Sequence, residues 1–232
     1  MRWKDISVYK FQQIDSINNK PIDQVDKTLF AACVLFGYTE FELDNLPLQK
    51  VAKFIDKIEK AFSSPPNPFA SRMVGKYLIE YRPDKLTFGQ YVELSFFFQM
   101  PVIQSCHYIV ASISRLPFRK NSASDHKNKA NYFATRSIEE ILGCVNKFRD
   151  NFEAFNKEYG SLFGGQNEDG EPVPVDKFTR RYGWTYSASC VAEYEKITLD
   201  QAYALPIRQA LNDLVYLKEK SIYEEKLLKD AR

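Results

Sequence analysis

The amino-acid sequence predicts an all-α protein, a multi-helix bundle, from three kinds of observation. Apolar residues recur every three or four positions through most of the chain, which is the period of a helix that buries one face. Capping boxes, in which Ser or Thr is followed three residues later by Glu or Gln, mark helix starts at Thr39, Thr87, Ser137 and Thr198. Leu-Pro pairs at 46–47 and 205–206 mark further starts, because proline is tolerated in the first turn of a helix.

Residues 1–62 are expected to form an N-terminal helical unit. An apolar stripe follows Pro21, and Gly37 is placed to end that helix as a C-cap. A short capped turn then leads to Pro47, which starts an amphipathic helix. The stretch SSPPNP at 63–68 ends this unit as a rigid turn or linker.

Residues 69–163 are expected to form the central helices. Pro101 starts a helix that is apolar on nearly all sides and should be buried, whereas the polar residues 117–131 are expected to form a mobile loop. The helix at 138–163 carries a heptad-like apolar stripe, which most often belongs to a core and alternatively forms a self-association or partner surface. That stripe consists of Ile141, Val145, Phe148, Phe152, Phe155, Tyr159 and Leu162.

A linker is expected at residues 164–177, because this stretch has no apolar periodicity, and a C-terminal helical unit is expected at 178–232. The C-terminal unit repeats the N-terminal motif of helix, capped turn and Pro-started helix. Residues 39–55 align with 198–214 without a gap, so that both capping boxes and both Leu-Pro pairs coincide. We therefore expect an internal helix–Pro–helix repeat, with chance similarity of common helix signals as the alternative.

Composition limits the function classes. The net charge of +2 lacks the clustered basic excess of a dedicated nucleic-acid binder, so nucleic acid is an unfavoured partner. The N-terminus is too polar for a signal peptide, and no apolar run approaches the roughly 20 residues that span a bilayer, so we expect an intracellular protein without a membrane partner. Aromatic residues make up 15% of the chain, which favours a packed assembly protein.

The sequence shows no catalytic, cofactor-binding or metal-binding motif. His107 lies in the buried-looking helix and is expected to be a hydrogen-bonded core histidine, whereas His126 is expected to be solvated. The cysteines, which lie far apart in or beside apolar helices, are expected to act as small hydrophobic residues: Cys33, Cys106, Cys144 and Cys190. We therefore predict a non-enzymatic protein without a cofactor.

One segment carries a family resemblance. Residues 181–225 begin with Tyr182-Gly183-Trp184, continue through a helix and a Thr-capped turn to Leu205-Pro206, and end in an apolar and charged helix. This order resembles the C-terminal part of tail assembly chaperones and related virion-assembly proteins of tailed bacteriophages. The stretches WKDISVYKFQQI near the N-terminus and LTFGQYVEL at 86–94 are similar to phage proteins of the same sort.

The resemblance implies an assembly role without catalysis, in which the chain binds tail-tube or tape-measure proteins in the host cytoplasm. The implied alternative is a structural virion component, such as a ring, connector or packaged protein near the portal or tail, and a nucleic-acid-contacting protein is the third reading. A homo-oligomer is compatible with either of the first two. The residues expected to bind the partner are Trp184, Tyr216 and Leu217, with Phe148, Phe152 and Phe155 as a second surface.

Overall fold

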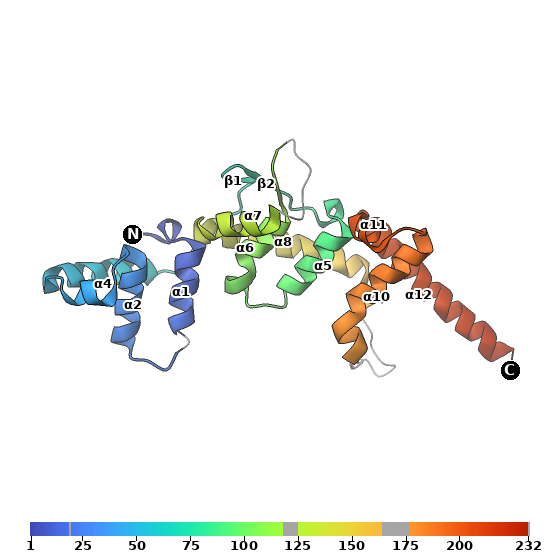
Figure 1. The fold of residues 1–232 in the computed structure, drawn as a ribbon, viewed down its shortest axis with the longest axis horizontal. Coiled ribbons are helices and arrows are strands. Elements are labelled where there is room, and N and C mark those ends of the chain that lie inside the picture. The colour runs from blue at the N-terminus through green and yellow to red at the C-terminus, as the bar shows by residue number, and fades with distance from the viewer. Residues whose placement is uncertain (19, 118–124, 164–176, 232) are drawn as a thin grey trace. The chain divides into compact units, whose positions relative to one another are not determined.

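The computed structural model describes residues 1–18, 20–117, 125–163 and 177–231 and is predominantly α-helical (Figure 1). The all-α prediction is therefore confirmed. A small antiparallel sheet, which the helical pattern does not predict, has the order β1 (Met73–Val74), β2 (Tyr77–Ile79) and β3 (Ser114–Arg115). In this sheet Met73 pairs with Leu78, and Leu78 pairs with Arg115.

The chain divides into two compact units. Unit 1 comprises Met1–Ile79 with Phe97–Lys147, and unit 2 comprises Glu80–Phe96 with Phe148–Arg232. Each unit therefore combines segments that are far apart in the sequence. These boundaries do not follow the expected segments, and the predicted linker lies almost entirely outside the described residues.

The elements follow the chain in this order. Unit 1 contains η1 (Trp3–Asp5), α1 (Val8–Asn18), α2 (Gln24–Phe36), α3 (Glu40–Asp44), α4 (Leu48–Phe62), β1 (Met73–Val74), β2 (Tyr77–Ile79), α6 (Val102–Ser112), β3 (Ser114–Arg115), α7 (His126–Ala134) and the first half of α8 (Ile138–Glu158). Unit 2 contains η2 (Pro83–Lys85), nearly all of α5 (Phe88–Phe97), the second half of α8, α9 (Gly160–Phe163), α10 (Lys177–Glu195), α11 (Leu199–Ala204) and α12 (Ile207–Asp230).

Three of the four predicted capping boxes are confirmed. The side chains of Thr39, Thr87 and Thr198 each accept a hydrogen bond from the backbone N–H three residues later. The box at Ser137 is wrong, because its buried hydroxyl has no hydrogen-bond partner. The predicted C-cap at Gly37 is confirmed by a left-handed φ of 76°, which glycine adopts without a steric penalty.

The helix–Pro–helix motif recurs as local structure. Pro47 and Pro206 have nearly the same backbone angles, with φ of −54° and −55° and ψ of 133° and 134°. The surroundings differ, because Leu48 is 86% exposed whereas the equivalent Ile207 is fully buried. The local signal is therefore repeated without a repeated tertiary environment.

A different repeat joins helix starts in pairs. In unit 1, an isolated antiparallel bridge connects Ser7 with Ser137, so that α1 and α8 begin together. The backbone N–H of Ile138 donates to the Ile6 carbonyl at 2.9 Å, and that of Val8 donates to the Arg136 carbonyl at 3.0 Å.

Unit 2 contains the same arrangement between α5 and α12. Thr87 bridges with Pro206, the backbone N–H of Ile207 donates to the Leu86 carbonyl at 3.0 Å, and that of Phe88 donates to the Leu205 carbonyl at 2.9 Å. Residues 3–14 and 83–94 also align without a gap, and each begins with a 3-10 turn. The bridged pair of helix starts is thus the tertiary repeat.

The expectation of a loop over residues 117–131 is wrong for its second half. Helix α7 begins at His126, and Lys129 is buried and donates to the Ser114 carbonyl at 2.9 Å. Polar residues enter a helix here because α6 and β3 supply backbone and hydroxyl partners for them. Residues 118–124 lie outside the described part of the chain.

Candidate binding groove

An open groove of about 360 Å³ lies between α10 and α12 in unit 2 and is closed at one side by α9. Its residues follow helical spacing on each element, which places them on facing sides of the two helices. The lining residues are Leu162 from α9, Trp184, Tyr186, Ser187 and Cys190 from α10, and Leu214, Leu217, Lys218, Ser221 and Ile222 from α12.

Trp184 is held at one wall of the groove by α5. Its ring meets Phe88 edge-to-face, with centroids 6.1 Å apart and planes at 72°, and meets Tyr91 at 5.6 Å and 81°. Both partners are buried, with Phe88 fully buried and Tyr91 2% exposed. Edge-to-face aromatic pairs favour a fixed ring orientation, so Trp184 presents a preformed apolar surface.

Lys218 provides a charged group beside this apolar wall. Its ammonium group donates to the Ser161 carbonyl, which connects α12 to the start of α9. A lysine in this position covers the apolar floor with its methylene stem and keeps its charge at the rim. On the opposite helix, a hydrogen bond with Cys190 raises the pKa of the exposed Tyr186. The groove therefore has an apolar floor with a few polar groups at its edge.

The structure brings together part of the predicted site. Trp184 and Leu217 line the same groove, as expected for one binding surface. Tyr216 lies outside it, half exposed, with its ring 5.5 Å from that of Tyr194. Sequence reasoning missed Leu162 and Ile222 as lining residues, since nothing in their local pattern distinguishes them from core positions.

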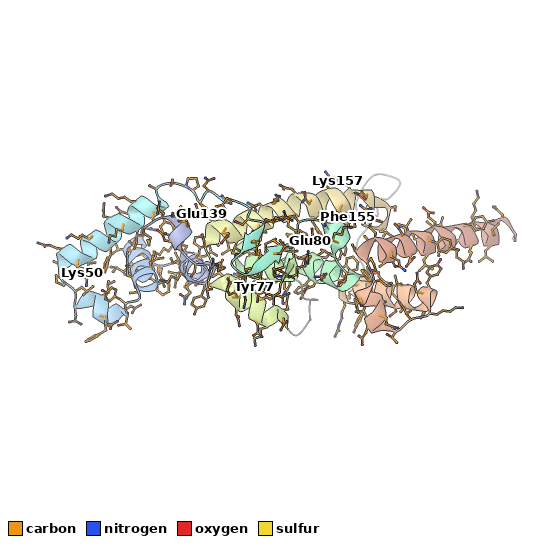
Figure 2. All side chains as sticks on the ribbon, turned by 90° about the horizontal axis from the view of Figure 1, so that it is seen from above. Lys50, Tyr77, Glu80, Glu139, Phe155 and Lys157 are labelled. Atoms are coloured by element: carbon orange, nitrogen blue, oxygen red, sulfur yellow. The ribbon has the colours of Figure 1, made fainter. Side chains whose placement is uncertain are left out.

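The predicted second surface is buried within the chain. Phe148 is fully buried, and Phe152 and Phe155 are 5% and 4% exposed. Figure 2 labels Phe155 and Lys157 on α8, and of these two side chains only Phe155 lies in the core. The heptad stripe is therefore core, and these three phenylalanines are not available to a partner in this structure.

A carboxyl pair lies between the same two helices. Burial raises the pKa of Asp213 on α12 to about 6, and the neighbouring Glu195 on α10 adds to the shift through its charge and a hydrogen bond. With this raised pKa, the Asp213 carboxyl group binds a proton at mildly acidic pH. This pair consequently links the packing of α10 and α12 to pH.

Unit 1 contains a Ser–His contact that resembles a catalytic pair. The imidazole Nε2 of His126 lies 3.0 Å from the Ser112 hydroxyl and 3.3 Å from the Tyr108 carbonyl. A carbonyl only accepts hydrogen bonds, so Nε2 carries the proton and is not a base for the hydroxyl. The hydroxyl itself donates to the same carbonyl at 3.1 Å. The contact is structural, and the expectation of a solvated His126 is wrong.

The second histidine is confirmed as a core residue. His107 is 8% exposed, and its Nδ1 lies 3.2 Å from the side-chain amide of Gln12. Burial lowers its pKa, and the charge of His126 acts in the same direction.

The cysteines behave as small apolar side chains. Cys33, Cys106 and Cys144 are buried, and burial raises the pKa of Cys106 to about 12. Across the part of the chain that the structure describes, no group of three or more His, Cys, Asp or Glu side chains is arranged to hold a metal ion.

A second pocket, of about 480 Å³, lies in unit 1 between α2 and α3. Its apolar floor includes Leu29 and Phe30, and its rim carries Asp26, Glu40 and Asp44. Burial and two of these carboxylates raise the pKa of the Cys33 thiol, which also lines the pocket. No described contact of this pocket indicates an occupant, so the groove of unit 2 is the stronger candidate.

No family model, curated protein or solved structure matches the chain significantly. The geometry of the molecule is therefore the basis for any functional assignment. Within the described ranges, no helix is long and apolar enough to cross a membrane.

Proposed function

We propose that this chain is a non-enzymatic assembly protein that holds an apolar segment of its partner in the groove between α10 and α12. The partner class is the tail-tube or tape-measure protein of a tailed bacteriophage, as implied by the resemblance of residues 181–225 to tail assembly chaperones. The observation that supports this proposal is the exposed apolar stripe of α12 facing the fixed ring of Trp184.

The energetics of the groove suit a reversible complex. Fully burying an apolar side chain such as Leu217 or Ile222 contributes roughly 1.5–3 kcal/mol. Ordering two partners offsets part of this gain, so a few such side chains support binding that can be released. Release is what an assembly chaperone requires, because its client must later join the particle.

Co-expression tests the proposal directly. The chain is produced together with the tail-tube and tape-measure subunits encoded in the same genome, and the soluble fraction of each subunit is measured. We expect one of them to remain soluble with the wild-type chain and to precipitate with Leu217→Asp. Leu48→Asp is the matched control, since it makes the same change at a leucine that is 86% exposed in unit 1. Equal solubility with and without the chain would contradict the proposal.

The alternative of a structural virion component predicts a different result. Mass spectrometry of purified particles then finds the full-length chain at a fixed copy number. A transient assembly protein is instead absent from finished particles, so this measurement separates the two roles.

A further inference from the structure

The two long helices of the tertiary repeat carry equivalent stripes. Both α8 and α12 start at a bridged residue pair, so Ile138 corresponds to Ile207 and the two helices align from there without a gap. In this alignment Phe148 corresponds to Leu217, and Phe152 corresponds to Ser221. The apolar stripe that leaves the bridge therefore runs along the same face of each helix.

The stripes differ in what covers them. On α8, Val145 and Phe148 are fully buried and Phe152 is 5% exposed. On α12, the equivalent Leu214 and Leu217 are only half-buried, and Ser221 is exposed. Beyond Ser221 the helix keeps exposed apolar residues, including Ile222 at 58% and Leu228 at 66%. Figure 1 shows this part of α12 projecting from the rest of unit 2.

Helix α5 covers the stripe of α8. The Tyr91 ring lies 5.0 Å from that of Phe152 and 6.3 Å from that of Phe155, and its hydroxyl donates to the Asn156 side chain at 2.8 Å. Tyr91 is the fourth residue of a helix that begins after the Thr87 cap. A capped helix with an aromatic residue at its fourth position is thus the element that fits this stripe.

In unit 1, the helix equivalent to α5 is α1, and it lies beside contacts within its own unit. On α1, Phe11 stands at the position of Tyr91, and its ring lies 5.5 Å from Trp3, which in turn contacts Phe62 of α4 at 4.5 Å. An amphipathic helix of the same unit therefore already packs at this end of α1. In the described part of unit 2, only residues of α9, α10 and α12 line the groove, and no second helix of the α5 type lies over the stripe of α12.

We infer that the groove between α10 and α12 docks a partner helix of the α5 type, namely a Ser- or Thr-capped amphipathic helix with Tyr or Phe at its fourth position. This inference rests on the proposed function, because it assumes that the groove binds protein. Ser221 stands where α8 has Phe152, so the stripe of α12 leaves space at this position that a phenylalanine side chain takes up on α8. The partner's aromatic side chain fills this space between Leu217 and Trp184.

A peptide copied from this chain serves as the probe. A synthetic peptide of residues 83–97, which spans η2 and α5, is titrated into the full-length protein, and the fluorescence of Trp184 is followed. The peptide contains no tryptophan, and the other tryptophan of the chain, Trp3, lies in unit 1. We expect saturable binding that weakens by at least about tenfold, equivalent to about 1.4 kcal/mol, with Leu217→Asp. The same peptide carrying Tyr91→Ala should bind equally poorly.

A second variant protects the test against misfolding. Ser221→Glu places a carboxylate in the lining of the groove from an exposed site, so it should weaken binding by at least about tenfold while far-UV circular dichroism stays unchanged. Leu48→Asp should bind the peptide as the wild type does. Binding that persists unchanged in Ser221→Glu would show that the peptide binds outside the groove and would overturn the inference, and absence of binding to the wild type would equally overturn it.

These experiments distinguish a failure of this inference from a failure of the proposed function. If the peptide does not bind but Leu217→Asp still loses a tail subunit in co-expression, the partner helix is of another type and the assembly role stands. If the peptide binds but no tail subunit is kept soluble, the groove specificity stands and the phage role fails. If light scattering finds a dimer that Ser221→Glu dissociates, the occupant is a second copy of the chain and the inference is wrong.

Discussion

The equivalence of α8 and α12 predicts that the same truncation has very different costs at two matched positions. Phe148→Ala and Leu217→Ala remove large side chains at aligned sites on the two stripes. Phe148 is fully buried, and Leu217 is half-buried at the groove. Both lie in unit 2, so the unfolding of one compact unit reports on both changes.

The magnitudes follow from the burial. Truncating a fully buried phenylalanine costs about 3–5 kcal/mol, because the lost transfer free energy adds to the cost of the cavity. Truncating a half-buried leucine beside solvent leaves no closed cavity, so only part of the transfer free energy is lost, roughly 1 kcal/mol. The expected difference in the free energy of unfolding is therefore at least about 2 kcal/mol.

Urea unfolding measures this difference through Trp184 fluorescence, in a Trp3→Phe background so that only unit 2 contributes to the signal. Far-UV circular dichroism in the same samples checks that both variants begin from the native helix content. Losses that agree within 1 kcal/mol would refute the reasoning, because Leu217 would then be covered as completely as Phe148.

The other predictions concern single contacts. Gly143→Ala should destabilise unit 1 by at least about 2 kcal/mol despite the higher helix propensity of alanine, because the new Cβ would lie 2.1 Å from the Phe69 carbonyl oxygen. Thermal unfolding measures this loss of stability, and an unchanged or raised midpoint temperature would contradict the close approach. Asp213→Asn tests the carboxyl pair. The pKa of Asp213 in the folded protein, about 6, is raised above the ordinary value of 3.8, so the folded wild type binds the proton more tightly than the unfolded chain does. The wild type therefore loses stability as the pH rises from about 4 to 6. The variant should lack this slope and, after allowing for solvent screening of a partly exposed group, should be more stable by about 1 kcal/mol at pH 7, as measured by urea unfolding across this pH range. Thr198→Ala should lower the free energy of unfolding by about 1 kcal/mol, because the helix cap is lost. Ser137→Ala should leave the free energy of unfolding unchanged, since the Ser137 hydroxyl has no hydrogen-bond partner. Equal losses of the two variants in denaturant unfolding would show that both caps are formed.

Local helix signals were predictable from the sequence because their physics is local. A threonine cap depends on a hydrogen bond to a backbone N–H three residues away, and the caps at Thr39, Thr87 and Thr198 all form. The same rule failed at Ser137, whose hydroxyl is buried without a hydrogen-bond partner. The isolated bridge to Ser7 does not explain this failure, because Thr87 is bridged to Pro206 in the same way and still forms its cap.

The candidate site was likewise predictable from the sequence only in part. Trp184 and Leu217 were identified from their type and position, and the structure places both at one groove. Phe148 belongs to a stripe for which the sequence left both a core and a partner surface open, because an apolar stripe looks identical in either setting, and the structure buries it. Only the packing of α5 against α8 decides between them.

The sequence by itself determined the helical class, most helix starts and the apolar faces, since these depend on spacing and on hydrogen bonds within one or two turns. Only the tertiary structure decided which of the two repeats extends from local backbone structure to tertiary contacts. The aligned helix–Pro–helix segments share backbone angles but not burial, whereas the bridged starts of α1 with α8 and of α5 with α12 define the true equivalence. Burial depends on what long-range neighbours cover each face, and that is why the stripe of α12 remains open while the stripe of α8 is closed.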